Sequence, residues 1–485
     1  MSNARIDTNL NETNEPSELN EALAKLEEEA KRLSKLIGQA KRSGEDVSEL
    51  IAAKKSLHQD KIEPLKKQIA ETVSEKTSEQ TTAQKQIKQL EAPAPYTNTP
   101  FLSNSDSLAL SLVDLADIGR DGVSESNNDS ISNNDSSATL KQHWDTYIAA
   151  HPSGNIYYEW RFLEAISRIF GHKIKLLTAT EKQSGQIIGV LPIVEQKSRL
   201  FGHLWTSIAF VNYGGPLCNN EKVEASIFEF IEQAAKQEGI KRLEVRGLYE
   251  RPIPDSWNCS KDKASMWLPL PSDNNSDTLL SSFKAKLRSQ IRKGYTDAVS
   301  AKVGGLELID DYYTVFARNM RDLGTPVYSK RLFSELLKTL ANQAWLVLIY
   351  HQGKPASAAF LIKTGDRMEI PWASTIRDYN RFGLNMVLYW EVLKLSCEQK
   401  CAVFDFGRSS IDATTYKFKK QWGAQPIQHY WYGYEPEEDS SSGQLQGTSK
   451  ASTENPKFKI LIACWKRLPI WLSKLIGPSI VKFIP

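Results

Sequence analysis

The spacing of hydrophobic positions sets an N-terminal segment apart from the rest of the chain. Apolar residues recur every three or four positions at Leu19, Leu23, Leu26, Ala30, Leu33 and Ile37. This is the a/d pattern of a coiled coil. It breaks in GQAKRSGED, where Gly38 and Gly44 allow the chain to reverse, and then resumes. We therefore predict an antiparallel two-helix coiled-coil hairpin over 17–91, in which Pro64 kinks the second helix or falls in an early turn.

A repeated order of predicted elements follows. Apolar spacing and turn residues predict helices over 144–170, strands at 173–180 and 185–196, a helix over 221–239 and a strand at 241–248. The order recurs as helices over 279–294 and 310–340, three strands within 344–374, a helix over 383–399 and a strand at 402–407. Turns at Gln352-Gly353 and Gly365-Asp366 separate the three strands. The repetition predicts a duplicated α/β unit that divides near residues 270–280.

Polar segments separate these regions. APAPYTNTP and SESNNDSISNNDSSAT make up much of residues 92–140, and EEDSSSGQLQGTSKASTEN fills most of 436–455. Such compositions bury too little apolar surface to fold. We predict disorder over 1–16 and 92–140 and a linker over 436–455. The remaining parts are the hairpin, two α/β domains at 141–275 and 276–435, and a tail at 456–485.

The tail combines basic and large apolar residues. It carries six Lys/Arg and no Asp or Glu, and its apolar residues at helical spacing are Trp465, Leu468, Trp471, Leu472 and Leu475. Pro469 and Pro478 interrupt it. A basic helix with Trp and Leu on its other face is typical of helices that lie on an anionic membrane. The alternative is that the tail docks onto the α/β domains.

Composition narrows the class of protein. The net charge of +3 argues against a dedicated nucleic-acid binder, which usually has a strongly basic domain. Cys397 and Cys401 have no second Cys/His pair nearby, so no metal site is predicted. The N-terminus lacks the apolar segment of a signal peptide, and no run reaches the roughly 18 apolar residues of a membrane span. We expect a cytoplasmic protein, placed at the inner membrane surface if the tail binds lipid.

Several motifs resemble a known family. EIPWASTIRDYNRFGLNMVLYWE and FDFGRSSIDATTYKFKKQWGAQP, with LRSQIRK, VFARNMRDLGTPVYSKRLF and NYGGP, are similar to FemAB-like proteins associated with exosortase/PEP-CTERM exopolysaccharide loci. The resemblance covers residues 140–435. It implies an α/β fold of two tandem GNAT-like acyltransferase domains that transfer an acyl or aminoacyl group to an amine. The donor substrate would be acyl-CoA or an aminoacyl-tRNA, with no tightly bound cofactor.

The stretch TTYKFKKQWGAQP sets lysines beside aromatic rings. Acyl transfer passes through a tetrahedral oxyanion, and a fixed cation beside that oxygen accelerates the reaction. On the family resemblance, Phe418 and Lys419 form the pocket pair, with Lys419 facing the acyl carbonyl. We expect an extended run in which Tyr416 and Phe418 form the pocket wall. If the run is helical, residues 416, 419 and 420 share a face; a solvated edge of charges is the simpler alternative.

A second motif lies where a GNAT fold places its pyrophosphate loop, between a strand and a helix. Backbone N–H groups at a helix N-terminus bind phosphate without side-chain charge. In RDYNRFGLNM the candidate residues are Asn380, Arg381, Gly383 and Asn385. The usual family pattern is Gln/Arg-x-x-Gly-x-Gly/Ala, and this sequence departs from it at both ends. The departure leaves room for a donor other than acyl-CoA, and an ordinary helix N-cap is the alternative.

Other charged residues are weaker candidates. Lys284, Arg288 and Arg292 are spaced four apart on one helix face, which suits a diphosphate or an acidic glycan as well as a solvated surface. FDFGRSS ends a strand, so Asp405 and Arg408 would point toward the crevice of an open α/β sheet. There they would contact substrate or form an ion pair that supports the pocket. Glu369, close to a strand end, is the candidate general base, because the attacking amine must lose a proton.

The hairpin has its own resemblance. LSKLIGQAKRSGEDVSELIAAKKSL is similar to the tRNA-binding arm of seryl-tRNA synthetases, which implies tRNA as a partner. From Ser17 to Glu91, however, 14 Lys/Arg balance 14 Asp/Glu. Phosphate binding needs a local excess of cations, so a spacer or self-association hairpin is the alternative.

Together these patterns lead to two functional hypotheses. The first is an N-acyltransferase acting on an amine of an exopolysaccharide or cell-envelope precursor, which is glycan or lipid-linked. The second is a non-catalytic GNAT-like module that binds a glycan precursor and scaffolds the exopolysaccharide machinery.

Overall fold

The computed structural model describes residues 16–43, 46–69, 71, 90–97, 107–118, 133–198, 202–251, 253–436 and 456–484. The chain divides into two units, Met1–Lys88 and Gln89–Pro485. The disorder predicted for 1–16 and the linker predicted for 436–455 fall almost entirely outside the described residues.

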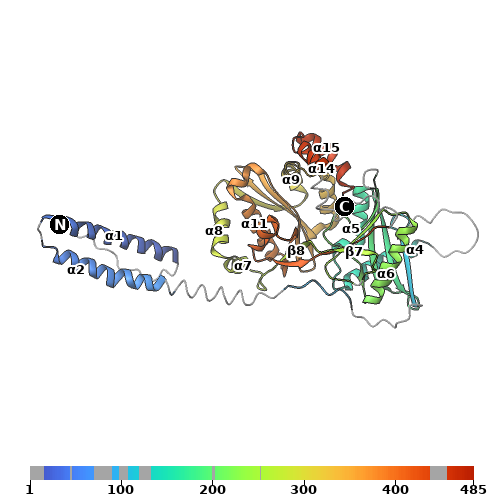
Figure 1. The fold of residues 1–485 in the computed structure, drawn as a ribbon, viewed down its shortest axis with the longest axis horizontal. Helices are drawn as coiled ribbons and strands as arrows, with labels where there is room; N and C mark the ends of the chain where they lie inside the picture. The colour runs from blue at the N-terminus through green and yellow to red at the C-terminus, as the bar shows by residue number, and fades with distance from the viewer. Residues whose placement is uncertain are drawn as a thin grey trace, which may run out of the picture. The chain divides into compact units, whose positions relative to one another are not determined.

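The first unit is helical. It contains α1 (Pro16–Ser43), α2 (Ser48–Ser56) and a π-helical turn (Leu57–Ile62), after which the helix continues to residue 69. The two helices lie side by side (Figure 1), and Lys66 Nζ lies 3.2 Å from Glu27 Oε1. Gly38 lies inside α1, so the reversal comes after Ser43. Coiled-coil packing and the resemblance to a tRNA-binding arm stay predictions.

The second unit contains two β-sheets. The described strands of the first are β1 (Leu108–Asp114), β2 (Lys173–Glu181), β3 (Ile187–Ser198), β4 (Gly202–Ser207), β5 (Leu217–Cys218), β6 (Arg242–Gly247), β7 (Trp257–Ser260) and β15 (Tyr430–Tyr434). Those of the second are β8 (Lys263–Pro269), β9 (Val299–Gly304), β10 (Ala344–His351), β11 (Lys354–Thr364), β12 (Arg367–Thr375), β13 (Val403–Ser410) and β14 (Gln425–Gln428).

The two sheets have the same topology, as the predicted duplication requires. The first follows the order β1-β2-β3-β4-β6-β15-β7, with β5 paired to β3, and the second the order β9-β10-β11-β12-β13-β8-β14. In each, the fourth and fifth strands are parallel and the other neighbours on the path are antiparallel. The sixth strand of each sheet comes from the other half of the sequence. The division predicted at 275/276 therefore does not separate the sheets: β8 precedes it and joins the second, while β15 completes the first.

The turns of the second sheet agree with the sequence. Gln352 and Gly353 have φ of 50° and 72° at the β10–β11 hairpin. Two consecutive positive φ values match the twist of a tight hairpin. Gly365, with φ of 56°, turns β11 into β12. Both predicted turns are confirmed.

The predicted disordered linker over 92–140 is wrong in part. Residues 108–114 form β1, which pairs with β2 through seven consecutive residues, from Leu108 opposite Glu181 to Asp114 opposite Lys175. The strand LALSLVD lies between two polar stretches whose composition dominates the segment. Helix α4 also begins inside the predicted linker, at Asn133.

Helices cover the sheets and form three hydrophobic cores. The described helices are α4 (Asn133–Ala150), α5 (Trp160–Phe170), α6 (Glu221–Gln237), α7 (Ser276–Ser282), α8 (Ala285–Gly294), α9 (Ile309–Leu323), α10 (Lys330–Leu340), α11 (Leu384–Glu398) and α12 (Thr414–Lys420). The largest core packs α5, α9 and α10 between the sheets, so it joins the two halves. Helix α6 covers the outer face of the first sheet, and α8 and α11 that of the second (Figure 1).

The tail forms two helices, α14 (Pro456–Trp465) and α15 (Ile470–Val481). Helix α15 contacts α9, so the docking that the sequence left as an alternative is present. Within the described residues, no helix combines the length and the apolar character that a membrane crossing requires.

Candidate active site

The candidate site lies where two parallel strands of the second sheet separate. Strands β12 and β13 pair only from Arg367 opposite Val403 to Glu369 opposite Asp405. Beyond this point β12 continues to Thr375 and β13 to Ser410 without pairing each other. The last pair therefore places two carboxyl groups at the start of an opening in the sheet.

Glu369 is buried and held by residues of the first half. Tyr157 Oη donates to Glu369 Oε2 at 2.6 Å, and Asn212 Nδ2 donates to Oε1 at 2.9 Å. Burial, and then the nearby Asp405 carboxylate, raise the pKa of Glu369 to about 7. The hydrogen bonds from Tyr157 and Asn212 reduce that rise because they stabilise the carboxylate. A carboxyl group with this pKa exchanges protons near neutral pH.

Asp405 is fully buried beside Glu369. Its Oδ1 accepts from the Gly407 backbone N–H at 2.7 Å, and Tyr213 Oη lies 3.5 Å from Oδ2. Burial raises the pKa of Asp405, although the Arg367 guanidinium opposes that rise. Two carboxylates in register resist being charged together.

An apolar cavity of about 50 Å³ opens onto Glu369. This is several times the volume of roughly 10–15 Å³ that one water needs. Its walls come from α5, α10, β11, β12 and the loop after β4: Tyr157, Phe162, Ile166, Phe210, Val211, Asn212, Leu332, Leu336, Ile362, Pro371 and Trp372. Most of these side chains are hydrocarbon, while Tyr157, Asn212 and Glu369 bring polar atoms to the cavity wall. Burial is the largest cause of the raised pKa of Glu369.

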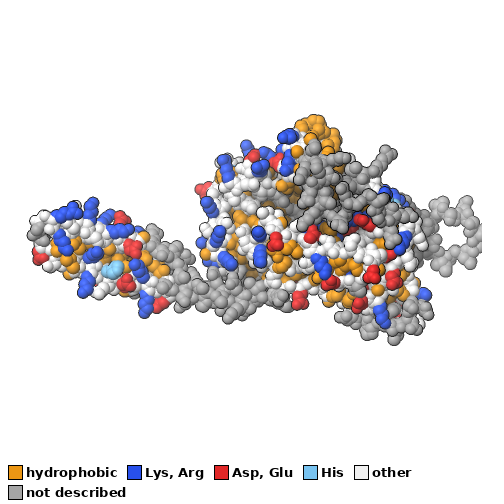
Figure 2. Space-filling model, in the orientation of Figure 1, with side chains coloured by type: hydrophobic (Ala, Val, Ile, Leu, Met, Phe, Trp, Pro, Cys, Tyr) orange, Lys and Arg blue, Asp and Glu red, His pale blue; other side chains and the backbone are white. Residues whose placement is uncertain are grey.

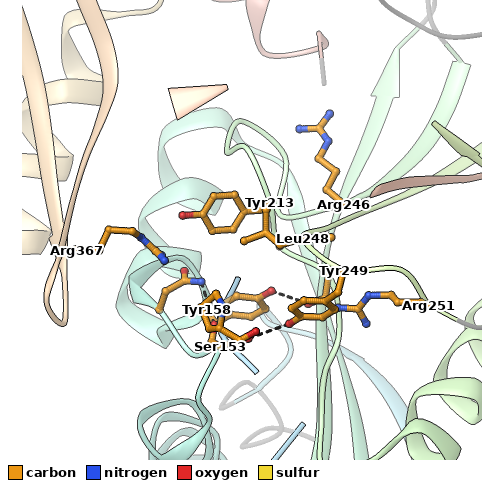
Figure 3. A pocket seen from close by; sticks show the side chains of 13 residues that line it. Ser153, Tyr158, Tyr213, Arg246, Leu248, Tyr249, Arg251 and Arg367 are labelled. Carbon is orange, nitrogen blue, oxygen red and sulfur yellow. Dashed lines mark hydrogen bonds between the residues drawn. The ribbon is translucent and has the colours of Figure 1, made fainter. Parts of the chain in front are cut away.

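Figure 3 shows a second, polar cavity. It has arginine and tyrosine side chains on its walls, and Arg367 reaches toward it from the second sheet. Arg246 and Arg251 are paired with Glu244 and Glu224. The Arg367 guanidinium instead lies over two rings, 5.5 Å from the centroid of Tyr213 and 4.7 Å from that of Trp267.

The two cavities share one boundary. The consecutive residues Asn212 and Tyr213 line the apolar and the polar cavity respectively. On β12, Glu369 lines the apolar cavity and Arg367 lines the polar one. These two residues are two positions apart and therefore lie on one face of the strand. The carboxyl pair therefore lies between an apolar and a polar compartment.

Lys419 is buried close to this pair. Its Nζ donates to the backbone oxygens of Gly407 at 2.9 Å and Arg408 at 3.0 Å, which leaves one of its three donors. Burial lowers the pKa of Lys419 to about 8, although the Asp405 carboxylate opposes the shift. Lys417 and Lys420 are exposed.

The extended conformation expected for this stretch is wrong. Residues 414–420 form α12, followed by a turn to Gly423 with φ of 91°. Lys419 therefore points inward from a short helix. Tyr416 and Phe418 pack against the core of the second sheet, and Phe418 lies 5.1 Å from Tyr389 between ring centroids. They line neither of the two cavities described above, so the pocket wall expected from them stays a prediction.

The candidate phosphate loop lies between β12 and α11, as predicted. Residues 377–382 form a 3₁₀ turn, Gly383 has φ of 67°, and α11 begins at Leu384. Asn380 and Arg381 are exposed, Asn385 is half-buried, and the Arg381 guanidinium lies over the Phe382 ring. Phosphate binding here stays a prediction.

The remaining charged candidates lie apart from both cavities. Lys284 is exposed at the N-cap position before α8, and Arg292 is exposed on the helix. Arg288 Nη1 donates to the Ser281 carbonyl at 3.1 Å. Arg408 forms no ion pair with Asp405: a bulge in β13 separates them, and the Arg408 guanidinium lies 4.6 Å from the centroid of Trp431.

The first half lacks an equivalent free carboxylate. Its parallel pair β4–β6 ends with Thr206 opposite Glu244, the topological counterpart of Glu369 opposite Asp405. Glu244 accepts hydrogen bonds from Arg246 Nε at 2.7 Å and Arg242 Nη2 at 2.8 Å. Burial would raise the pKa of Glu244, but Arg246 and then Arg242 hold it low. The carboxyl pair of the second half, in which burial raises both pKa values, therefore has no raised counterpart at this position of the first half.

We expect the Glu369→Gln variant to reveal a pH-dependent part of the stability. The folded pKa of Glu369 is about 7 and the ordinary value is 4.5. Between these values the folded state holds a proton that the unfolded state has released. The stabilisation from this proton is therefore complete below the lower value and is lost as the pH rises through the higher one.

Denaturant unfolding of the wild type and the variant across this range tests the expectation. The wild type should lose free energy of unfolding relative to the variant as the pH rises. If the free energy of unfolding of the wild type instead rises relative to that of the variant as the pH rises, the assigned direction of the pKa shift is wrong.

Comparison with known protein families finds a match within the second half. Residues 281–420 match the acetyltransferase (GNAT) domain family. The matched segment contains Glu369, Asp405 and Lys419. The matched segment is thus similar to a GNAT acetyltransferase domain, and the first half repeats the topology of the second sheet. No curated protein matches the chain.

Three solved structures are among those similar to this chain. The crystal structure of FemX is 14% identical, covers 63% of this chain and 98% of its own, and gives a TM-score of 0.49. A tandem GNAT protein from the clavulanic acid biosynthesis pathway is 11% identical over 67% of this chain and 98% of its own, with a TM-score of 0.41. Saccharomyces cerevisiae N-myristoyltransferase with bound myristoyl-CoA is 11% identical over 72% and 87%, with a TM-score of 0.40.

Proposed function

We propose that the chain is an N-acyltransferase that transfers an acyl group to an amine of an exopolysaccharide or cell-envelope precursor. Glu369 is the observation that carries the proposal. It is a buried carboxyl group with a pKa near neutrality, held by two donors at the opening between β12 and β13. A general base works best when its pKa is close to the working pH. The resemblance to FemAB-like proteins supports the acceptor class.

In the proposed reaction, Glu369 takes a proton from the acceptor amine, and the amine nitrogen attacks the acyl carbonyl carbon. The electron pair of the carbonyl moves to its oxygen, and Lys419 contributes positive charge to stabilise that oxyanion. The bond to the leaving group then breaks, and the leaving group takes the proton that Glu369 accepted from the amine. Tyr157 and Asn212 orient Glu369 through their hydrogen bonds.

We assign the donor to acyl-CoA and its acyl group to the apolar cavity. The matched family is one of acetyltransferases, and the cavity walls beside Glu369 suit a hydrocarbon group. The unpaired edges of β12 and β13 offer backbone donors and acceptors for the amide groups of such a donor.

Filling the apolar cavity tests this assignment. Leu336 lines the cavity from α10, so Leu336→Phe should raise KM for the acyl donor by roughly tenfold or more, because the acyl group loses its space. Leu337→Phe is the matched control: it enlarges a neighbouring buried leucine that does not line the cavity. Equal KM values for the acyl donor in both variants would show that the acyl group does not bind in this cavity.

Incubation with labelled donors tests the function itself. Purified protein is given radiolabelled acetyl-CoA and, separately, charged tRNAs, each with amino-sugar acceptors. Label from acetyl-CoA on the acceptor amine is the expected result. Transfer from aminoacyl-tRNA would correct the donor. No transfer from either, with retained glycan binding, would favour the non-catalytic scaffold.

The N-terminal helices have a separate proposed role in self-association. Equal numbers of acidic and basic residues between Ser17 and Glu91 do not supply the cation excess that tRNA binding needs. Apolar residues at a/d spacing are typical of helices that pair with each other.

A further inference from the structure

The C-terminal tail docks through its small residues. Ser473, Gly477 and Val481, four apart on α15, are the buried positions of that helix. Gly477 lies against the backbone of Val327, where an added Cβ would come within 2.7 Å of backbone N and O. This face of α15 therefore approaches the α/β unit at backbone distance.

Side chains from both halves hold the tail in place. Arg321 Nη1 donates to the Leu468 carbonyl at 2.8 Å. His172 Nε2 lies 2.7 Å from the Lys482 carbonyl, and Gln196 Nε2 donates to the same oxygen at 3.1 Å. The orientation of α15 is consequently fixed, and so is the face that it turns outward.

The outward face carries several large apolar side chains of the tail. Trp471 and Leu475 are each 67% exposed, and Leu461 on α14 is 62% exposed. Figure 2 shows hydrophobic side chains gathered at the position of these helices, with basic side chains beside them. An amphipathic helix in a soluble protein normally buries such residues. Here the arrangement is reversed, because the small residues face inward.

The tail itself carries charge of one sign. Residues 456–484 contain six Lys/Arg and no Asp or Glu. Lys466 and Arg467 are exposed, and among the described residues no carboxylate lies within ion-pair distance of either. Exposed Trp and Leu beside unneutralised cations match a bilayer with anionic headgroups, which offers hydrocarbon below a negative surface.

We propose that the docked α14–α15 pair is a membrane-binding surface for anionic lipid. Trp471 and Leu475 enter the boundary between headgroups and acyl chains, while Lys466 and Arg467 contact the headgroups. Because α15 is fixed to both halves of the α/β unit, binding would hold the active-site domain at a set orientation to the bilayer. This proposal is independent of the acyl-transfer activity.

Vesicle co-sedimentation of the full chain tests it. The wild type should sediment with vesicles that contain phosphatidylglycerol and much less with phosphatidylcholine alone. The double variant Trp471→Ser, Leu475→Ser should lower the affinity by roughly tenfold for each side chain. Lys466→Gln with Arg467→Gln should lower it by roughly fivefold for each cation, in anionic vesicles only.

The matched control is Val303→Ser with Leu306→Ser, which removes two exposed apolar side chains, 46% and 41% exposed, from the second half outside the tail. This variant should bind vesicles as the wild type does. Equal losses in the control and tail variants, or no binding of the wild type to anionic vesicles, would overturn the proposal. A sedimentation velocity experiment that showed a dimer abolished by the tail variant, without vesicle binding, would assign the patch to a second copy of the chain.

Discussion

Glu369→Gln is expected to lower kcat for acyl transfer by roughly 10²–10⁴-fold, the usual effect of losing a general base. The amide has the same shape and can still accept a hydrogen bond, and the Tyr157 hydroxyl can turn to accept one from it. The fold should therefore survive, and KM for the acyl donor should change little. Initial rates with saturating donor and acceptor measure the effect.

Glu391→Gln is the matched control. Glu391 lies on α11, accepts a hydrogen bond from Tyr295 and pairs with Lys394 at 2.8 Å, and it lines neither cavity. The same loss of a carboxylate there should leave kcat within about twofold, because effects away from the reacting atoms are small. Comparable losses in the two variants would show that the role given to Glu369 is wrong.

Lys419→Met is expected to have two effects. The loss of positive charge beside the oxyanion should lower kcat by roughly 10²–10³-fold. The loss of the ammonium also leaves the Gly407 and Arg408 carbonyls without their donor, so the variant should be less stable by about 1–3 kcal/mol. Kinetics must be measured below the melting temperature of the variant, with circular dichroism as the check of folding.

Lys420→Met separates the two possible origins of a rate loss. Lys420 is adjacent and exposed, so its removal should affect neither stability nor kcat appreciably. A folded Lys419 variant with near-normal turnover would reduce Lys419 to a support of the β13 bulge. Equal losses of kcat in both lysine variants would show that Lys419 has no specific catalytic role.

The sequence predicted the repeated α/β order because each half alternates clear helical and strand periods. It missed β1 because LALSLVD is a short apolar run inside polar low-complexity sequence, and composition outweighed it. It could not show that β8 and β15 join the sheet of the other half. Both are short apolar strands, and the apolar pattern of a strand does not determine which sheet the strand joins.

The candidate site was predicted only in part, because some of its contacts join the two halves of the chain. Glu369, Asp405 and Lys419 were identified from motifs of the second half and come together in the structure. Tyr157, Asn212 and Arg367 were not assigned roles, because Tyr157 and Asn212 reach Glu369 only through packing of the two halves. NYGGP, which contains Asn212 and Tyr213, was the available signal. The α12 helix was missed because alternating Lys and aromatic residues also fit a strand.

The pH dependence of kcat/KM, measured for the wild type and Glu369→Gln, tests most directly whether Glu369 is the base. The wild type should gain activity as the pH rises through about 7, where Glu369 releases its proton, and lose it above about 8, where Lys419 becomes neutral. In the variant the rise near pH 7 should be absent from the residual rate. The same rise in both proteins would contradict general-base catalysis by Glu369.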